Sequence, residues 1–439
     1  MTEKRRGAVF LRAALHHLWL AGLGVCVGLA AGVVCGAFGA GLNAIVPFAH
    51  ENFQSNVWFL PLAGLLTAAM FHLCGRDRPG MTAVFAAARG ERAALPLRGA
   101  AVQFAGTWCA HFFAASVGRE GAAVQIGASL GNRIGNSAGP ADAGRTMTVA
   151  GMAAGFSALF MTPLAALCFA LEAVYLGRAG ARAVVPCVLA SFAAFFTAGL
   201  YGLAPHTYAL GALPAFDWLL LAKCLGMGAL FGLAGLLFSF ARRFFGRFFA
   251  VSVQNAFLRV FAGGVLLSCL LYLTGGRYAG LGTDIVDAAI SGEKIYAADF
   301  ALKILFTAAT LGAGFIGGEV TTMFAAGAAL GAALADIFGV PAELAVCLGY
   351  AAVFGAATGT LAAPVLLGCE IFGFAAFPFL FFACAAAYVF GFGQTVYGKS
   401  AANTALADKL PAFPRKRMCP LPRRLYGAVR MPKKRNALS

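Results

Sequence analysis

The sequence predicts an all-α protein that crosses a membrane many times, and three observations lead to this fold class. Hydrophobic residues make up 61% of the 439 residues and charged residues only 11%, whereas soluble domains carry about 25% charged residues. Apolar runs of about 20 residues, long enough to cross a bilayer core as helices, recur along the chain. Glycine-rich segments with a lone carboxylate occur twice at matching positions, which indicates an internal repeat.

The apolar runs give the predicted helical segments in order. They are Leu18–Phe48, Met147–Leu171, Ala183–Leu203, Phe216–Phe240, Val260–Leu273 with its flanks, and Ala345–Phe392 in several pieces. The first run is too long for the apolar core of a signal peptide and shows no small-residue cleavage site, so we interpret it as a retained span. We therefore expect a basic N-terminus over residues 1–17, a first membrane repeat over 18–215, a second over 216–402, and a basic tail over 403–439.

The formal net charge of +16 is concentrated at the two ends of the chain. Lys4, Arg5 and Arg6 lie at one end and a Pro-, Lys- and Arg-rich segment at the other. In a membrane protein such clusters favour cytoplasmic placement of both termini, so no nucleic-acid partner is expected. A positive field could also favour a transported anion. We expect a multi-pass protein of the bacterial inner membrane, embedded in the lipid bilayer.

The residues that carry most catalytic and metal chemistry show no site pattern. The 12 cysteines are scattered singly through apolar runs with no C-x-x-C pair, as is typical of small buried hydrophobes. The six histidines lack the spacing of metal ligands. No nucleotide-binding loop and no hydrolase motif occur. We therefore predict that the chain is not an enzyme and uses no cofactor.

The repeat is carried by two glutamate segments. Gly118-Arg119-Glu120 begins a stretch that ends at Gly131, and Gly317-Gly318-Glu319 begins another that ends at Gly331. A proline and a second lone glutamate follow each stretch: Pro163 and Glu172, then Pro364 and Glu370. The two glutamates of each half are 52 and 51 residues apart. Two halves with matching broken, glycine-rich hydrophobic segments are a known transporter plan, in which the substrate site lies where interrupted helices meet.

The chemistry predicted for the first segment follows from its position before a helix. A helix N-terminus offers unpaired N–H groups and a positive dipole end, which suits an anion. Glu120 would compete with a soluble anion for these donors while ionised and would leave the site when protonated. It would thus serve as gate and proton carrier. Ionisable groups inside the membrane are functional by default because burying them is costly. The alternative is an ion pair with Arg119 at the membrane surface.

The other three glutamates keep simpler alternatives open. Glu319 could be a carboxylate that caps a helix N-terminus. Glu172 and Glu370 each end an apolar stretch near a small loop, so we expect them at the membrane interface.

The motif G-R-E-G at Gly118–Gly121, followed by an apolar Gly/Ala helix, resembles the gating-glutamate motif of the CLC chloride channel and transporter family. The resemblance extends from about Val25 to Ser400. The second motif, G-G-E-V-T-T, is similar to a CLC anion-site motif. Tyr397, in G-Q-T-V-Y-G-K-S, stands where CLC proteins place the tyrosine that closes the inner side of the anion pathway.

Other residues resemble the fluoride-exporting branch of this family. They are Glu319 followed by Thr321, and Met81 in Pro79-Gly80-Met81, where chloride-type members usually carry a serine. Three positions depart from the patterns. Ala122 follows the first motif, where the fluoride branch usually has threonine. Thr322 replaces a common proline. Ala173 follows Glu172, so the internal proton glutamate of chloride/proton exchangers is absent.

The resemblance implies a homodimer in which each subunit has its own anion pathway, built from an inverted repeat of tilted and broken helices. The partners it implies are fluoride or chloride ions and protons. It places proton transfer on Glu120 and Glu319. It assigns anion binding to Met81, Gly118, Arg119, Gly121, Gly318, Thr321 and Tyr397. Fluoride is small and accepts hydrogen bonds strongly, so close donors such as the Thr321 hydroxyl suit it.

The function predicted from the sequence is therefore fluoride/proton antiport gated by Glu120. The alternative is a chloride channel or a chloride/proton exchanger of the same fold. The glycine of Pro79-Gly80-Met81 is expected to permit close backbone approach. Tyr397 could instead be an interfacial anchor. Phe85, near Met81, is a candidate for lining the path.

Overall fold

The structure is a computed structural model that describes residues 3–73, 80–92, 94–140, 142–174, 177–215 and 217–399. The predicted basic tail and Pro79 lie outside these residues. The side chains of Lys4, Arg5 and Arg6 are likewise not described. The described residues up to the loop after residue 199 form α1 (Glu3–Glu51), α2 (Phe53–Asn56), η1 (Val57–Phe59), α3 (Leu60–Leu73), α4 (Met81–Ala88), α5 (Leu97–Phe112), α6 (Glu120–Ala138), α7 (Ala143–Phe160), α8 (Pro163–Val174) and α9 (Gly177–Gly199).

The second part of the chain repeats much of this order. Its elements are α10 (Trp218–Ser252), α11 (Ala256–Leu273), α12 (Thr283–Ile290), α13 (Asp299–Ala313), α14 (Val320–Phe338), α15 (Ala342–Thr358), α16 (Ala362–Phe372), η2 (Phe374–Ala376), α17 (Phe377–Phe390), β1 (Gln394–Thr395) and β2 (Gly398–Lys399). The two short strands pair as an antiparallel hairpin. The prediction of an all-α fold is confirmed, with this hairpin as the small addition.

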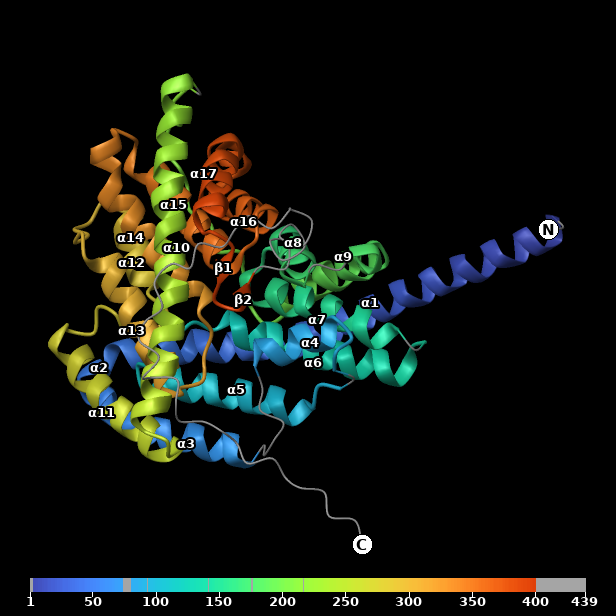
Figure 1. The fold of residues 1–439 in the computed structure, drawn as a ribbon, viewed down its shortest axis with the longest axis horizontal. Helices are drawn as coiled ribbons and strands as arrows, with labels where there is room; N and C mark the ends of the chain where they lie inside the picture. Colours follow the sequence, from blue (N-terminus) through green and yellow to red (C-terminus); the bar gives the residue numbers. More distant parts are fainter. Residues whose placement is uncertain are drawn as a thin grey trace, which may run out of the picture. The chain divides into compact units, whose positions relative to one another are not determined.

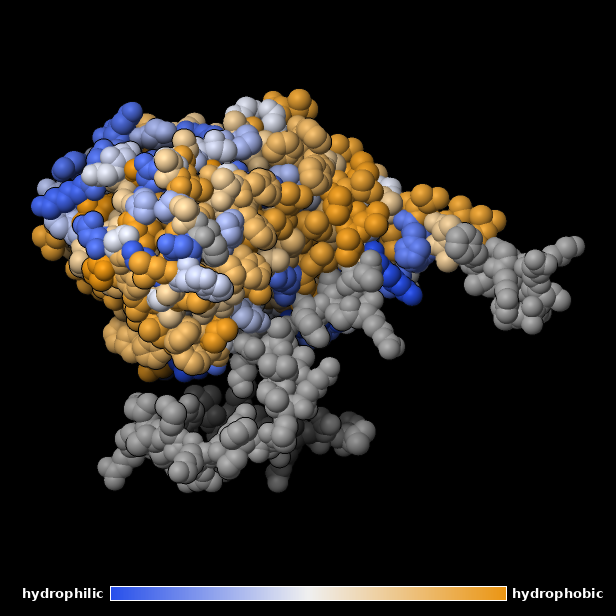
Figure 2. Space-filling model, turned by 90° about the horizontal axis from the view of Figure 1, so that it is seen from above, coloured by the Kyte–Doolittle hydropathy of each residue, from blue (hydrophilic) through white to orange (hydrophobic). Residues whose placement is uncertain are grey.

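Within the described residues, six helical stretches are long and apolar enough to cross a membrane. They are Leu11–Glu51, Phe53–Leu73, Arg182–Gly199, Trp218–Ser252, Ala256–Leu273 and Val320–Phe338. Hydrophobic residues cover most of the face seen in Figure 2, and hydrophilic residues gather toward one edge. Large apolar side chains such as Trp218, Leu219 and Leu273 are exposed on these helices. An apolar exterior of this kind is what a bilayer solvates.

Other helices are too short to cross a membrane. α8 has 12 residues and α16 has 11, which at 1.5 Å per residue is far less than the roughly 30 Å of a hydrocarbon core. The predicted run Met147–Leu171 is not one helix, because the chain breaks between α7 and α8. Met161 adopts a left-handed φ of 58° there, and Pro163 starts the next helix because it cannot continue the previous one.

Matching helices of the two repeats pack in the same way. α6 lies against α7, and α14 lies against α15 (Figure 1). Glycine makes each pairing close. A Cβ on Gly127 would meet the carbonyl oxygen of Gly151 at 2.2 Å, and a Cβ on Gly327 would meet that of Gly349 at 2.1 Å. Backbones that approach this closely are typical of helix pairs in membranes, where small residues form the interface. The glycine-rich character of the repeat is therefore a packing requirement.

Candidate anion site

The two glutamate segments predicted from the sequence meet inside the molecule. Gly118 and Gly318 exchange two backbone hydrogen bonds, each 2.6 Å long, in an antiparallel bridge. A Cβ on Gly318 would stand 2.7 Å from the amide nitrogen of Gly121, so only glycine fits at this crossing. Directly after the bridge, α6 begins at Glu120 and α14 begins at Val320. The first turns of two matching helices therefore converge on one buried point.

Glu120 occupies this point. Its side chain is fully buried, and Oε2 accepts hydrogen bonds from the backbone N–H of Arg119 and of Thr321, both at 3.1 Å. The second donor belongs to the first turn of α14, so the carboxylate of one repeat binds the helix N-terminus of the other. Oε1 lies 3.5 Å from Arg119 Nε, and among the described residues it has no hydrogen-bond partner. Glu120 is near Arg119, as the alternative reading had it, but it does not lie at the surface.

Arg119 connects the start of α6 with α1. Its Nη1 donates to Asn43 Oδ1 at 3.4 Å. Its buried Nε has no hydrogen-bond partner in the part of the chain that the structure describes. This Nε lies 3.5 Å from Glu120 Oε1, so the guanidinium forms an ion pair with that carboxylate.

Glu319 precedes α14 but does not cap it. It occupies the N-cap position, yet its side chain makes no capping hydrogen bond. Its Oε2 lies 4.0 Å from Arg242 Nε, and its side chain is 16% exposed. The reading of Glu319 as a helix-capping carboxylate is therefore wrong. Its carboxylate stays free of the helix end, which leaves the N–H groups of α14 to Glu120.

Thr321 and Thr322 are neighbours with opposite hydrogen bonding. The Thr322 hydroxyl donates to the Glu319 carbonyl at 2.7 Å. The Thr321 hydroxyl is buried and has no partner among the described residues. A buried hydroxyl without a partner is uncommon and points to a missing ligand. It sits on the same residue whose N–H binds Glu120.

Phe85 and Tyr397 lie side by side, and Met81 begins the helix that carries Phe85. Phe85 and Tyr397 are in edge-to-face contact, with ring centroids 5.1 Å apart. Met81 and Tyr397 both pack against the large apolar core. The expected role of Gly80 is wrong. Its φ of 167° is extended and a Cβ there would meet nothing within 4 Å, so no close approach requires this glycine.

Glu172 and Glu370 do not lie as free interfacial carboxylates. Glu172, on α8, accepts from the backbone N–H groups of Leu361, Ala362 and Ala363 at 2.8–3.2 Å, at the start of α16. Glu370, on α16, accepts from Leu164 and Ala165 at 3.0 and 2.8 Å, at the start of α8. Each glutamate caps the helix that carries the other. The two carboxylates thus satisfy N–H groups that the ends of short helices would otherwise leave unpaired.

A buried lysine that the sequence reasoning missed lies behind the bridge. Lys303, on α13, is fully buried, and its Nζ donates to Ser116 Oγ at 3.3 Å and to the carbonyl oxygens of Tyr278, Ala279 and Gly280 at 2.9–3.2 Å. Its lone position in the apolar run F-A-L-K-I-L-F was the signal that could have revealed it, since a buried charge needs partners.

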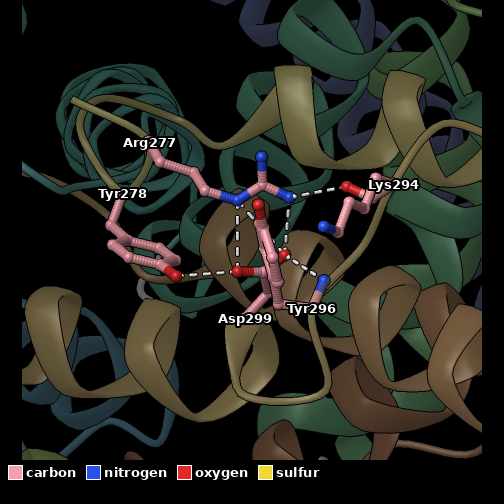
Figure 3. A network of polar contacts seen from close by, with 5 residues as sticks. All are labelled: Arg277, Tyr278, Lys294, Tyr296 and Asp299. Atoms are coloured by element: carbon pink, nitrogen blue, oxygen red, sulfur yellow. Dashed lines mark hydrogen bonds and ion pairs between the residues drawn. The ribbon is translucent and has the colours of Figure 1, made fainter. Parts of the chain in front are cut away.

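Asp299 holds the loop that supplies these carbonyls. Figure 3 shows its carboxylate between Arg277, Tyr278 and the backbone of Tyr296. Arg277 Nη2 donates to Oδ2 at 2.6 Å, and the Tyr278 hydroxyl donates to Oδ1 at 2.7 Å. Arg277 also donates to the carbonyl oxygen of Lys294 at 3.1 Å. This network fixes the loop before α12 in one arrangement, so the carbonyls that receive Lys303 are held in place.

The geometry defines a class of protein. A helical membrane protein with two matching repeats, whose interrupted helices converge on a buried carboxylate and unpaired donors, has the plan of a secondary transporter or channel. Within the described ranges, no cluster of histidine, cysteine, aspartate or glutamate could hold a metal ion.

Comparison with known proteins gives the family. The family model described as voltage gated chloride channel matches residues 64–391. A chloride/fluoride channel protein of Pseudomonas syringae pv. tomato is 33% identical over 383 residues, which are 84% of this chain and 83% of that protein. A putative chloride channel protein, ClcB-like, of Ralstonia nicotianae is 30% identical over 256 residues, 54% of this chain and 57% of that protein.

Solved structures agree. The crystal structure of a CLC-type fluoride/proton antiporter superposes with a TM-score of 0.84 at 38% identity, over 86% of this chain and 96% of that one. A slow cyanobacterial Cl⁻/H⁺ antiporter gives a TM-score of 0.74 at 18% identity, over 89% and 97%, which shows a shared fold. The chain belongs to the voltage-gated chloride channel (CLC) family, with the inverted-repeat fold of that family, and transports anions across a membrane.

Proposed function

We propose that this chain exchanges fluoride for protons and so exports fluoride, with Glu120 as the gate. The observation that carries the proposal is the contact between Glu120 Oε2 and the N–H of Thr321, whose own hydroxyl has no partner among the described residues. An anion that replaces the carboxylate would receive this N–H and the free hydroxyl together. Fluoride, a small anion and a strong hydrogen-bond acceptor, gains most from two close donors.

The proposed proton transfer uses Glu319 as its second carboxylate, because Glu172 already caps a helix. Glu172 is occupied as a cap of α16, and Ala173 follows it, so neither position offers a free internal carboxylate. Glu319 stands next to the anion site. Its side chain makes no capping hydrogen bond and is partly exposed. Proton transfer through Glu120 and Glu319 therefore needs no further acidic group.

The relatives support the same choice. The structure that matches at 38% identity is a fluoride/proton antiporter, and the relative at 33% identity is a chloride/fluoride channel protein. That second name keeps a chloride channel or a chloride/proton exchanger as the other candidate function.

The test is halide release from liposomes that contain the purified protein, with fluoride and chloride measured separately and proton movement followed by a pH-sensitive dye. We expect fluoride to leave far faster than chloride and to drive proton uptake. Met81→Ser should raise chloride flux relative to fluoride, because it adds a hydroxyl donor where a soft thioether now stands. Equal fluxes of the two halides in the wild type would replace this proposal with the chloride alternative.

We also propose the oligomeric state and the membrane orientation of the protein from its family membership. It is a homodimer with one pathway per subunit, in a bacterial inner membrane and with both termini in the cytoplasm. Protease accessibility of the tail in oriented vesicles tests the placement of the termini, and crosslinking in native membranes tests the homodimer.

A further inference from the structure

Two adjacent arginines, Arg242 and Arg243, lie inside the long apolar helix α10. They interrupt the run L-L-F-S-F-A-R-R-F-F, and α10 is one of the helices long enough to cross a membrane. Charged groups within such helices are costly, so they face the protein interior, pair with carboxylates or backbone carbonyls, and mark functional paths. The partners of these two arginines therefore indicate what the pair does.

Arg242 reaches the start of α14. Its Nε lies 4.0 Å from Glu319 Oε2, and the two side chains are 32% and 16% exposed. This is the one ion pair that Glu319 forms in the described structure. Solvent weakens an ion pair between exposed groups, but here the carboxylate is mostly buried. Arg242 therefore favours the ionised form of Glu319 over the protonated form.

Arg243 reaches the hairpin that leads to Tyr397. Its Nη1 donates to the Thr395 carbonyl oxygen at 3.0 Å. The Thr395 hydroxyl in turn accepts from the Tyr397 N–H at 3.2 Å. Val396 donates to the carbonyl oxygen of Ala357, in the last turn of α15, at 2.9 Å. The hairpin is thus held at two points, by Arg243 and by the end of α15, and both points lie next to Tyr397.

The backbone of α10 is fixed close to both arginines. A Cβ on Gly312, in the last turn of α13, would stand 2.8 Å from the Cβ of Phe245, and a Cβ on Gly235 would stand 2.7 Å from that of Ala356 on α15. Small residues at such crossings let membrane helices pack closely. Both crossings lie within about two turns of Arg242. The arginines are therefore carried by a part of α10 that has little freedom to shift.

The other charged groups on the helices that pack against α14 have partners of their own. These contacts are Glu120 with the N–H of Thr321, Lys303 with Ser116, Asp299 with Arg277, Asp284 with His50, Asp287 with Tyr208, Glu343 with the N–H of Gly211, and Lys223 with the carbonyl oxygen of Gly339. Tyr350 stacks on Phe324 of α14, and a tyrosine is uncharged near neutral pH. Arg242 is therefore the charged group that acts on Glu319 through a direct ion pair.

We propose that Arg242 and Arg243 are positioning residues for two different parts of the site. Arg242 holds the ionised Glu319 and sets how readily this carboxylate takes up a proton. Arg243 holds the hairpin and so keeps Tyr397 in the anion pathway. The inference rests on the proposed function, in which Glu319 carries protons, and on the predicted anion contact of Tyr397. Because one helix carries both arginines, α10 fixes the proton group and the tyrosine relative to each other.

The test of Arg242 compares Arg242→Gln with Arg242→Lys, which keeps the charge. Halide and proton fluxes are measured in liposomes over a series of pH values. Loss of the charge favours protonated Glu319, so the pH at which proton-coupled flux falls to half on the alkaline side should rise by about one unit, a tenfold change in proton affinity. Arg242→Lys should keep most of the wild-type midpoint. In a Glu319→Gln background, Arg242→Gln should cause no further change, because Arg242 acts through that carboxylate.

The test of Arg243 uses the proton-to-halide ratio. Arg243→Gln should lower this ratio and leave the pH midpoint unchanged, because it loosens the hairpin and not Glu319. Combined with Tyr397→Ala, it should lower the ratio no further than Tyr397→Ala alone, since two changes that act through one group are not additive. Arg247→Gln, exposed on the same helix, is the matched control and should keep the wild-type midpoint and ratio.

A direct measurement of Glu319 does not depend on transport. In infrared spectra of the purified protein, the carboxylic acid C=O band that Glu319→Gln lacks should appear at a higher pH in Arg242→Gln than in the wild type. If a glutamine variant does not fold, as judged by thermal unfolding in detergent, Arg242→Met or Arg243→Met takes its place, because methionine suits an apolar helix.

A folded neutral variant of Arg242 with the wild-type midpoint and the wild-type infrared profile would overturn the role of Arg242. A folded neutral variant of Arg243 with the wild-type ratio would overturn the role of Arg243. If the wild type carries chloride and no fluoride, the proposed fluoride exchange fails by itself. The chloride fluxes and the infrared profiles of the same variants then decide the roles of the two arginines.

Discussion

Thr321 and Thr322 provide a paired test of the anion site, because one hydroxyl is unpaired and the other is satisfied. Replacing threonine by valine keeps the shape of the side chain and removes only the hydroxyl. Thr321→Val removes an oxygen that has no partner within the described structure. Thr322→Val removes a hydroxyl that donates to the Glu319 carbonyl at 2.7 Å. Both positions are buried in the first turn of α14.

When no anion is bound, Thr322→Val should lower the stability and Thr321→Val should not. An unpaired buried hydroxyl costs about 1–3 kcal/mol, so its removal should leave the free energy of unfolding unchanged or slightly raised. A satisfied hydrogen bond contributes about 0.5–1.5 kcal/mol, so Thr322→Val should lower the free energy of unfolding by about that amount.

Bound fluoride should reverse the order of the two variants in free energy of unfolding. If the Thr321 hydroxyl donates to a bound fluoride ion, its loss costs about 1.5–3 kcal/mol of binding, or about one to two decades in Kd. At a fluoride concentration of about 100 times the wild-type Kd, binding stabilises the wild type by about 2.7 kcal/mol. A variant with a Kd about 100-fold weaker gains only about 0.4 kcal/mol under the same conditions. Thr322→Val should keep the full wild-type gain.

The assay is thermal unfolding in detergent across a series of sodium fluoride concentrations, with sodium chloride at equal ionic strength as the reference. The reasoning is refuted if Thr321→Val lowers the stability of the anion-free protein and still responds to fluoride as the wild type does. That result would mean that the hydroxyl has an ordinary structural partner and that fluoride does not use it.

Variants at three further positions test the gate, the tyrosine beside Phe85 and the helix cap. Glu120→Gln should keep both N–H contacts but abolish fluoride-driven proton uptake, because the amide cannot take up and release a proton as a carboxylate does. Wild-type coupling in the liposome assay would contradict the role of Glu120 as the gate. Tyr397→Ala removes the edge-to-face contact with Phe85 and should lower the proton-to-fluoride ratio, whereas unchanged binding and coupling would leave only an anchoring role. Glu172→Ala should lower the unfolding temperature through a loss of about 1–3 kcal/mol at the start of α16, with Glu172→Gln less affected; equal unfolding temperatures would contradict the cap.

Sequence reasoning located the repeat because the repeat depends on local residue types. Glycines that let two helices touch, and a carboxylate at the start of the helix, recur at nearly the same spacing in both halves. The match of α6 with α14, each 19 residues long, follows from that spacing. The presence of Glu319 and Thr321 at one helix start could likewise be predicted, since both lie within one turn of Gly318.

The long-range partners could not be predicted. Glu172 and Glu370 look like interfacial residues in sequence, because each follows an apolar run near a loop. Their true partners lie about 190–206 residues away on the matching helix, and only the inverted arrangement brings them together. Lys303 was missed for the same reason, since the carbonyls that accept its hydrogen bonds come from a loop in which Gly282 adopts a left-handed φ of 84°. A Cβ on Gly282 would stand 2.7 Å from Lys303 Cε.

If Glu120 is the gate, as we propose, its hydrogen bonds also explain how one carboxylate could bind and leave on each transport cycle. Oε2 holds two N–H donors, while Oε1 holds none in the described structure. A fluoride ion in its place would receive the Thr321 N–H and gain the Thr321 hydroxyl, so the ion and the carboxylate offer the site similar numbers of hydrogen bonds. The site filled by the carboxylate and the site filled by fluoride then differ little in free energy. The protonation of Glu120 suffices to decide between them. A site that bound either group much more tightly would stop the cycle, since conduction requires binding weak enough to be reversed.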